Sequence, residues 1–176
     1  YSDTNSFAEI SHPLDKDLRD ELAVDQSLIM RLKNANISLE DLEIAGAALL
    51  RSDYIEQYRC AIVKAGECDP NILGIISDLV LAVDVVDTCL VFSVLPSGIK
   101  LSVRSCIKEV KASELVANIT KGLGSGGGHM MKAGGFIPMS LFVPAYLKYC
   151  DELDLLPRME LTPDGKSERP TMSAIK

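Results

Sequence analysis

The spacing of apolar residues predicts helices in the first third of the chain. Apolar side chains recur at helical intervals, at Leu14, Leu18, Leu22, Leu28, Ile29 and Leu32. Ser38 and Asp41 then resemble a capping box, with Asp in place of the usual Glu, and predict a second helix over residues 39–51. We therefore expect residues 13–52 to form a helical linker between two lobes.

Further along, the pattern changes between strand and helix. Residues 54–64 are rich in β-branched and aromatic side chains and predict a strand. Asp69 followed by Pro70 is typical of an N-cap and first helical position, and predicts a helix that reaches about Ala82. Residues 88–95 predict a second strand, which ends at a turn.

The second half of the chain continues this alternation. Residues 99–105 alternate apolar and polar side chains and predict the returning strand of a hairpin. Ser113 predicts the cap of a helix over 114–122, followed by a glycine loop and a short strand at Phe136 and Ile137. For residues 140–149 a helix and a strand both remain open, because Pro144 weakens a helix.

The order of elements predicts an α/β fold with a mixed β-sheet and flanking helices, with α+β as the alternative. We expect the sheet and its helices to form a domain over residues 53–155. Three prolines and many polar residues predict an extended or disordered tail over residues 156–176.

Composition narrows the class of protein. Apolar residues make up 47% of the 176 residues, enough for a core, and no long uncharged stretch predicts a membrane span. The chain begins with Tyr rather than Met, which favours a piece of a longer protein. The five cysteines are odd in number and lack CxxC spacing, so we expect a reduced, cytoplasmic protein without a disulfide framework or zinc knuckle.

Charge is distributed unevenly along the chain. The net charge of −7 argues against binding long nucleic acid. Residues 99–132, however, carry a net charge of +4, which leaves −11 for the rest. A positive segment in an acidic protein favours a small anionic ligand, although a helix face that is basic by chance would give the same pattern.

The glycine run at residues 124–128, followed by His129, predicts an anion-binding loop. Glycine lacks Cβ, so successive backbone N–H groups can approach a phosphate closely. Lys121 and Lys132 would add positive potential, and His129 could donate to a phosphate or stack beside a base. The alternative is a flexible linker. The run matches neither the Rossmann nor the P-loop pattern.

A second candidate lies on the preceding strand. Ser102 and Arg104 share one face of a strand, because side chains alternate with a period of two. The guanidinium of Arg104 offers a bidentate fork for phosphate. The alternative is an arginine that only faces solvent.

Together these segments resemble a known family. The strand sequence Ser-Val-Arg-Ser (102–105), a short helix, Gly-Gly-Gly-His (126–129) and Ala-Gly-Gly (133–135) resemble the DHH-associated substrate-binding domain of DHH phosphoesterases. That group includes oligoribonuclease/pAp-phosphatase-like proteins, single-strand exonucleases and cyclic dinucleotide phosphodiesterases, and a relative ends alanyl-tRNA synthetase. The resemblance covers roughly residues 54–140.

The resemblance implies roles for particular residues. Arg104 would hold a phosphate with Ser102 or Ser105. The remaining substrate contacts would come from Gly126, Gly127, Gly128, His129 and Lys132. Met130, Met131 and Lys132 stand where many members have smaller or polar residues, which leaves the base preference open.

The N-terminus adds to the resemblance. Residues 2–7 resemble the last motif of the DHH catalytic domain, so residues 1–12 would be its remnant, and Asp3 would be a ligand of a two-Mn²⁺ site. A turn or capping Asp is the alternative. The other metal-binding motifs of that family are absent from the chain, so we expect Mn²⁺ to bind only in the full-length protein and this chain alone to be inactive.

These observations give one favoured function and two alternatives. The favoured function is the substrate-binding part of a metal-dependent phosphoesterase that hydrolyses short oligonucleotides or nucleotide phosphates. Its partners would be a short oligonucleotide, pAp or a cyclic dinucleotide, together with a missing catalytic lobe. We expect no membrane association, and a homodimer is an alternative to a monomer. The alternatives are a non-catalytic nucleotide- or RNA-binding module, and a structural or dimerisation domain in which the glycines form a hinge.

Overall fold

The computed structural model describes residues 37–156, together with Asp17 and Ser27. Residues 39–156 belong to one compact unit. Asp3, the helical pattern of residues 14–32 and the predicted tail beyond residue 156 lie outside the described residues. The division into domains at residues 12, 52 and 155 therefore stays a prediction.

A six-stranded mixed sheet forms the centre of this unit, in the order β1-β2-β3-β4-β6-β5. Within this sheet only β2 and β3 pair in parallel, and every other neighbouring pair is antiparallel. The strands are β1 (Asp53–Ile55), β2 (Cys60–Ala65), β3 (Thr88–Leu95), β4 (Gly98–Ser105), β5 (Ser125–Gly128) and β6 (Lys132–Pro138). This arrangement confirms the predicted α/β fold with a mixed sheet.

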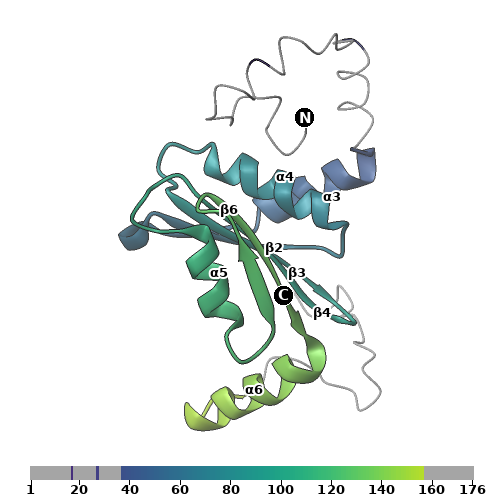
Figure 1. Cartoon of the computed structure of the whole chain (residues 1–176). Helices are drawn as coiled ribbons and strands as arrows, with labels where there is room; N and C mark the ends of the chain where they lie inside the picture. The colour runs from purple at the N-terminus through teal and green to yellow at the C-terminus, as the bar shows by residue number, and fades with distance from the viewer. Residues whose placement is uncertain (1–16, 18–26, 28–36, 157–176) are drawn as a thin grey trace. The chain divides into compact units, whose positions relative to one another are not determined.

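The α-helices that the structure describes lie on both faces of the sheet (Figure 1). Helices α3 (Leu39–Leu49) and α4 (Pro70–Leu81) cover β2 and β3 on one face. Helices α5 (Ala112–Thr120) and α6 (Met139–Glu152) cover β4 and β6 on the other. None of the helices within the described residues has the length and apolar character needed to cross a bilayer.

The core is correspondingly divided in two. Under α3 and α4, buried Val63, Val91 and Ile76 belong to one apolar cluster. A second apolar cluster lies on the opposite face, between the sheet and α5 and α6, and includes the buried residues Val103 and Val116. Each half of the sheet is thus packed mainly on one face, which leaves sheet surface uncovered on the other.

Two predicted features are found as expected. Asp69 caps α4, its carboxylate accepting a hydrogen bond from the N–H of Asn71 at 2.8 Å, and Pro70 is the first helical residue. The hairpin of β3 and β4 turns at Pro96 and Ser97, and β4 begins at Gly98, whose φ is +155°. A Cβ at Gly98 would lie 2.3 Å from the carbonyl oxygen of Ile137, so only glycine fits there.

The single strand predicted over residues 54–64 was wrong. It is divided into β1 and β2 by a 3₁₀ turn at Glu56–Tyr58 and by Arg59, which has a φ of 46°. The side chain of Arg59 explains the break, because its Nε donates to Asp87 at 2.7 Å and its Nη2 to the carbonyl of Asp84. Propensity cannot reveal such a long-range anchor.

Two further local predictions were wrong, and for residues 140–149 the structure shows the helix rather than the strand that was also open. Ser113 is not a cap, because α5 begins at Ala112, whose N–H donates to the carbonyl of Met130 at 2.7 Å. Pro144 does not prevent a helix, since α6 runs through it. The predicted glycine loop is the edge strand β5, paired along its length with β6.

Candidate functional site

One part of the sheet surface brings together four of the residues singled out in the sequence, which are Ser102, Arg104, Gly127 and Lys132. On β4, Lys100, Ser102 and Arg104 point to the face on which α4 packs, because side chains alternate along a strand. Ser102 and Arg104 contact α4 itself. The register places Lys132 and Gly134 of β6, and Gly127 of β5, on this same face. We call these six residues the open face, since α5 and α6 pack on the other side.

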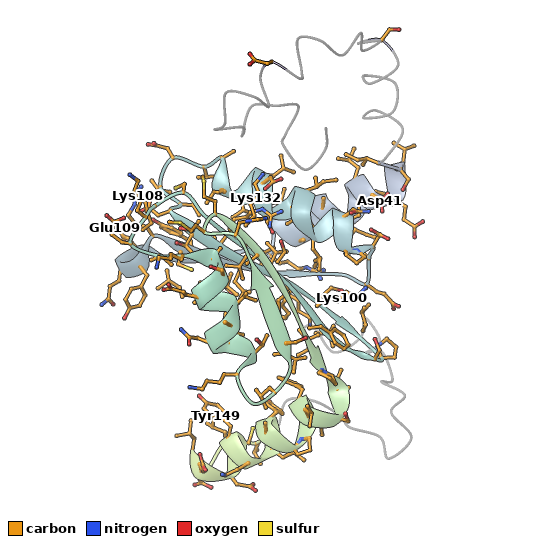
Figure 2. All side chains as sticks on the ribbon, in the orientation of Figure 1. Asp41, Lys100, Lys108, Glu109, Lys132 and Tyr149 are labelled. Atoms are coloured by element: carbon orange, nitrogen blue, oxygen red, sulfur yellow. The ribbon has the colours of Figure 1, made fainter. Side chains whose placement is uncertain are left out.

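Arg104 and Lys132 are the cationic centre of the open face. They are direct partners across the β4–β6 ladder. Opposite residues in an antiparallel pair have Cβ atoms about 5 Å apart, so these two basic side chains start next to each other on one surface. Lys100 lies four residues back on β4, about 13 Å away at 3.3 Å per residue. Lys132 and Lys100 mark the two ends of this surface in Figure 2.

The guanidinium of Arg104 is held by its neighbours. Its Nε donates to the Oδ1 of Asp78 on α4 at 2.8 Å, and its Nη1 donates to the Oγ of Ser102 at 3.2 Å. The Arg104 side chain is only 13% exposed, whereas that of Asp78 is 56% exposed. Arg104 is therefore a partly buried cation with a fixed orientation, rather than an arginine that only faces solvent.

The glycines divide into two groups by the face they occupy. Gly127 and Gly134 are partners on the open face, and both are exposed. A Cβ at Gly127 would meet nothing within 4 Å. They form a flat floor beside Arg104 and Lys132, on which a planar or extended ligand can rest against the backbone.

Gly126 serves packing instead. It pairs with Gly135 on the face covered by α5. A Cβ at Gly126 would lie 3.0 Å from side-chain atoms of Val116 and Thr120, and one at Gly135 would lie 2.9 Å from Val116. These two glycines allow α5 to approach the sheet closely.

Gly128 and His129 begin the turn between β5 and β6. Gly128 has a φ of +149°, and the N–H of His129 donates to the carbonyl of Lys132 at 2.7 Å. The turn is anchored at its tip, where the carbonyls of Met130 and Met131 accept hydrogen bonds from Ala112 and Ser105. The side chain of His129 is exposed at the end of the sheet where Lys132 begins β6.

Ser105 does not join this group. It points to the opposite face from Arg104 and is fully buried. Its hydroxyl donates to the carbonyl of Ile107 at 3.2 Å, and the N–H of Ile107 donates back at 3.3 Å. The structure therefore brings together Ser102, Arg104, Lys132 and Gly127, with His129 and Gly128 at one end.

The buried thiol of Cys89 lies beside Arg104 in the β3–β4 ladder. Burial raises the pKa of Cys89 to about 11, and the positive charge of Arg104 opposes this rise. The Sγ of Cys89 lies 3.4 Å from the carbonyl oxygen of Ser77, to which it donates. The thiol of Cys89 therefore stays protonated beside Arg104 at neutral pH.

The described residues do not form a metal site. No group of three or more His, Cys, Asp or Glu side chains that could hold an ion is found among them. Asp3, the predicted manganese ligand, lies outside the described residues. Divalent ions prefer several oxygen ligands together, so the described part of the chain does not fit a manganese centre.

The sequence gives no direct signal for three residues at or beside the open face. Gly134 lies in the Ala-Gly-Gly stretch, and strand alternation from Arg104 identifies it only when the β4–β6 register is known. Asp78 and Gly74 come from α4, and no local signal links them to Arg104.

Comparison with known proteins agrees with the fold. No protein-family model matches the chain, and no curated protein matches it. Among solved structures, an exopolyphosphatase-related protein from Bacteroides fragilis matches 87% of this chain and 48% of its own, at 20% identity and a TM-score of 0.61. The chain thus spans about half the length of that protein.

Two looser matches have TM-scores below 0.5. RecJ from Thermus thermophilus, in complex with Mn²⁺, matches 85% of this chain and 22% of its own, at 23% identity and a TM-score of 0.46. The C-Ala domain of alanyl-tRNA synthetase from Aquifex aeolicus matches 58% of this chain and 96% of its own, at 19% identity and 0.44. The likeness to the exopolyphosphatase-related protein, at a TM-score of 0.61, agrees with the fold expected from the resemblance.

Proposed function

We propose that this chain is the substrate-binding part of a metal-dependent phosphoesterase that acts on short oligonucleotides or nucleotide phosphates. The domain of residues 53–155 would grip the phosphorylated ligand on the open face. The metal ions, expected to be Mn²⁺, would belong to a catalytic lobe of the full-length protein. The sequence resemblance and the shared fold support this assignment.

The observation that carries the proposal is the Arg104–Lys132 pair beside the glycine floor. Two adjacent cations on one sheet surface attract an anion with more than one negative charge. The uncovered floor at Gly127 and Gly134 lets that anion approach the backbone. The rest of the chain is strongly acidic, so this surface is where an anion would bind.

The open face would bind and orient the ligand without reacting with it. Arg104 would donate to phosphate oxygens, and Lys132 would add charge. N–H groups on the outer edge of β5 could donate as well, because β5 pairs only with β6. Holding the distant end of a substrate in this way positions the bond that is cut elsewhere. The exposed His129 and Met130 would then lie where a base could contact them.

Calorimetric titration tests this proposal. We expect the chain to bind pAp and pApA, and Arg104→Ala to weaken binding at least about tenfold, because a charge-assisted hydrogen bond is lost. Lys148→Ala on α6 removes an exposed lysine away from the open face and should bind as the wild type does. Equal affinities of Arg104→Ala and the wild type would contradict the proposed site.

A further inference from the structure

The hydrogen bonds of Arg104 involve Nε and Nη1. Nε donates to Asp78 at 2.8 Å, and Nη1 donates both to Ser102 at 3.2 Å and to the carbonyl of Val103 at 3.3 Å, which accounts for three of the five N–H groups of a guanidinium. Within the described residues, neither N–H of Nη2 donates to a protein acceptor. If Arg104 binds the anion as proposed above, Nη2 is the group that remains to do so.

A chain of hydroxyls fixes the Nη1 side of the guanidinium. Ser77 on α4 donates its single proton to the carbonyl of Leu73 at 2.7 Å. The Oγ atoms of Ser77 and Ser102 lie 2.9 Å apart, so Ser102 must be the donor of that pair. Ser102 is then left as an acceptor for Arg104, and both serines are buried.

Asp78 fixes the Nε side. Its carboxylate accepts from Nε and lies at the exposed edge of α4, one helical turn beyond Gly74. Without this hydrogen bond, the N–H of Nε would donate to water, and the guanidinium group could rotate about the bonds of the Arg104 side chain. The ion pair is more exposed on the Asp78 side, so its contribution to folding stability is small.

Gly74 provides the space for Nη2. A Cβ at Gly74 would lie 3.2 Å from the Nη2 of Arg104, closer than most real Cβ contacts. Glycine in a helix interior is unfavourable relative to alanine. Its presence in the middle of α4 therefore has a local reason, which is the approach of the guanidinium.

We propose that Asp78 is the positioning residue of the anion site. Together with the Ser77–Ser102 pair, it holds Arg104 so that Nη2 stays available to a phosphate oxygen, and Gly74 keeps that position open. The proposal rests on the proposed function for the identity of the ligand, but the orientation of Arg104 can be measured without any ligand.

The first measurement is the side-chain Nε–H signal of Arg104 in ¹H–¹⁵N NMR spectra of the whole chain, assigned with Arg104→Lys. We expect slow exchange with water in the wild type, its loss in Asp78→Ala, and its retention in Asp78→Asn, whose amide oxygen can still accept from Nε. Glu114→Ala is the matched control, because it breaks the exposed Lys111–Glu114 pair away from the site. An unchanged Arg104 signal in Asp78→Ala would overturn the proposal.

The second measurement is binding of pAp and of tripolyphosphate to the same variants. A positioning role predicts that Asp78→Asn binds at least as tightly as the wild type, whereas Asp78→Ala binds about tenfold more weakly. If Asp78 acted only by repelling anions, both variants would bind more tightly than the wild type, and the positioning role would be wrong. We expect melting temperatures to change by no more than about 4 °C, so misfolding can be recognised.

Gly74→Ala gives a variant that leaves Asp78 in place. It should keep the Nε–H signal and weaken binding of both probes, because the added methyl group occupies the space beside Nη2. Binding equal to that of the wild type would show that Gly74 does not contribute to the anion site. If the wild type binds neither probe while Asp78→Ala still loses the Arg104 signal, the proposed function fails and the positioning of Arg104 by Asp78 stands.

Discussion

At the scale of single residues, the direction of each side chain decides its role more than its identity does. Ser102 lies two residues before Arg104, and Ser105 lies one residue after it. Ser102 supports Arg104 on the open face, whereas Ser105 is buried on the other face and bonds to the backbone of Ile107. A phosphate on the open face could therefore be contacted only by Arg104 and its same-face neighbours.

Cys89, beneath Arg104, gives a testable consequence of burial. Its pKa is raised to about 11 in the folded chain from an ordinary value of 9.0. The unfolded state therefore loses its proton first as the pH rises, and the folded state is disfavoured from pH 9 up to about pH 11. This thiol should lower the free energy of unfolding by about 2 to 3 kcal/mol across that range and have no such effect at neutral pH.

Urea unfolding of the wild type and Cys89→Ser between pH 7.5 and 10.5 measures this effect. The serine hydroxyl can still donate to the carbonyl of Ser77 and does not titrate in this range. We expect the wild type to lose stability more steeply with pH than the variant. Cys60 and Cys68 are present in both proteins, so parallel curves would show that Cys89 does not contribute.

At the scale of elements, β5 is the part of the fold that differs most from its sequence pattern. Four residues, three of them glycine, form a strand because β6 supplies hydrogen-bond partners along one edge and α5 packs on one face. Glycine is unfavourable in strands by propensity. Here it serves close packing on one side and an open surface on the other.

Two neighbouring alanine substitutions separate these uses of β5. Gly126→Ala places a methyl group 3.0 Å from Val116 and Thr120 and should lower the melting temperature by several degrees. The methyl group of Gly127→Ala meets nothing within 4 Å, so this variant should leave the melting temperature nearly unchanged. It should weaken pAp binding several-fold, because the methyl group would keep the ligand away from the backbone of β5. Thermal unfolding and calorimetry of both variants check this. Similar stability losses would mean that the two faces of β5 are wrongly assigned.

At the scale of the whole molecule, the helices cover the sheet in two opposite halves. Helices α3 and α4 pack on one face and α5 and α6 on the other (Figure 1). The open face is what this arrangement leaves uncovered next to α4. Its cationic pair, its glycine floor and its supporting carboxylate thus come from three strands and one helix that are distant in sequence.

The metal-binding motifs of the whole chain bear on catalysis. The sequence lacks the other metal-binding motifs of the family that it resembles, so we predict that this chain alone shows no turnover of bis-p-nitrophenyl phosphate with Mn²⁺ above a protein-free blank. Nucleotide binding should persist when the metal is chelated. Robust Mn²⁺-dependent turnover would contradict the assignment of this chain to the binding part alone.

The sequence by itself determined the elements whose signals are local. The cap at Asp69 and Pro70, the β3–β4 hairpin with its turn after Leu95, and the α/β class are all found as predicted, because each depends on neighbouring residues or on simple periodicity. Ser102, Arg104, Lys132 and Gly127 could also be chosen from sequence, since a strand period and a glycine run single them out.

The tertiary structure decided the rest, because it depends on contacts between distant segments. The bond from Ala112 to Met130 sets the start of α5, Arg59 divides the first strand by bonding to Asp87, and pairing with β6 turns the glycine run into a strand. Register alone places Gly126 under α5 and Gly127 in the open. Only the packing of α4 against β4 reveals that Asp78 and Gly74 set the orientation of Arg104, since those residues lie about 30 positions earlier in the chain.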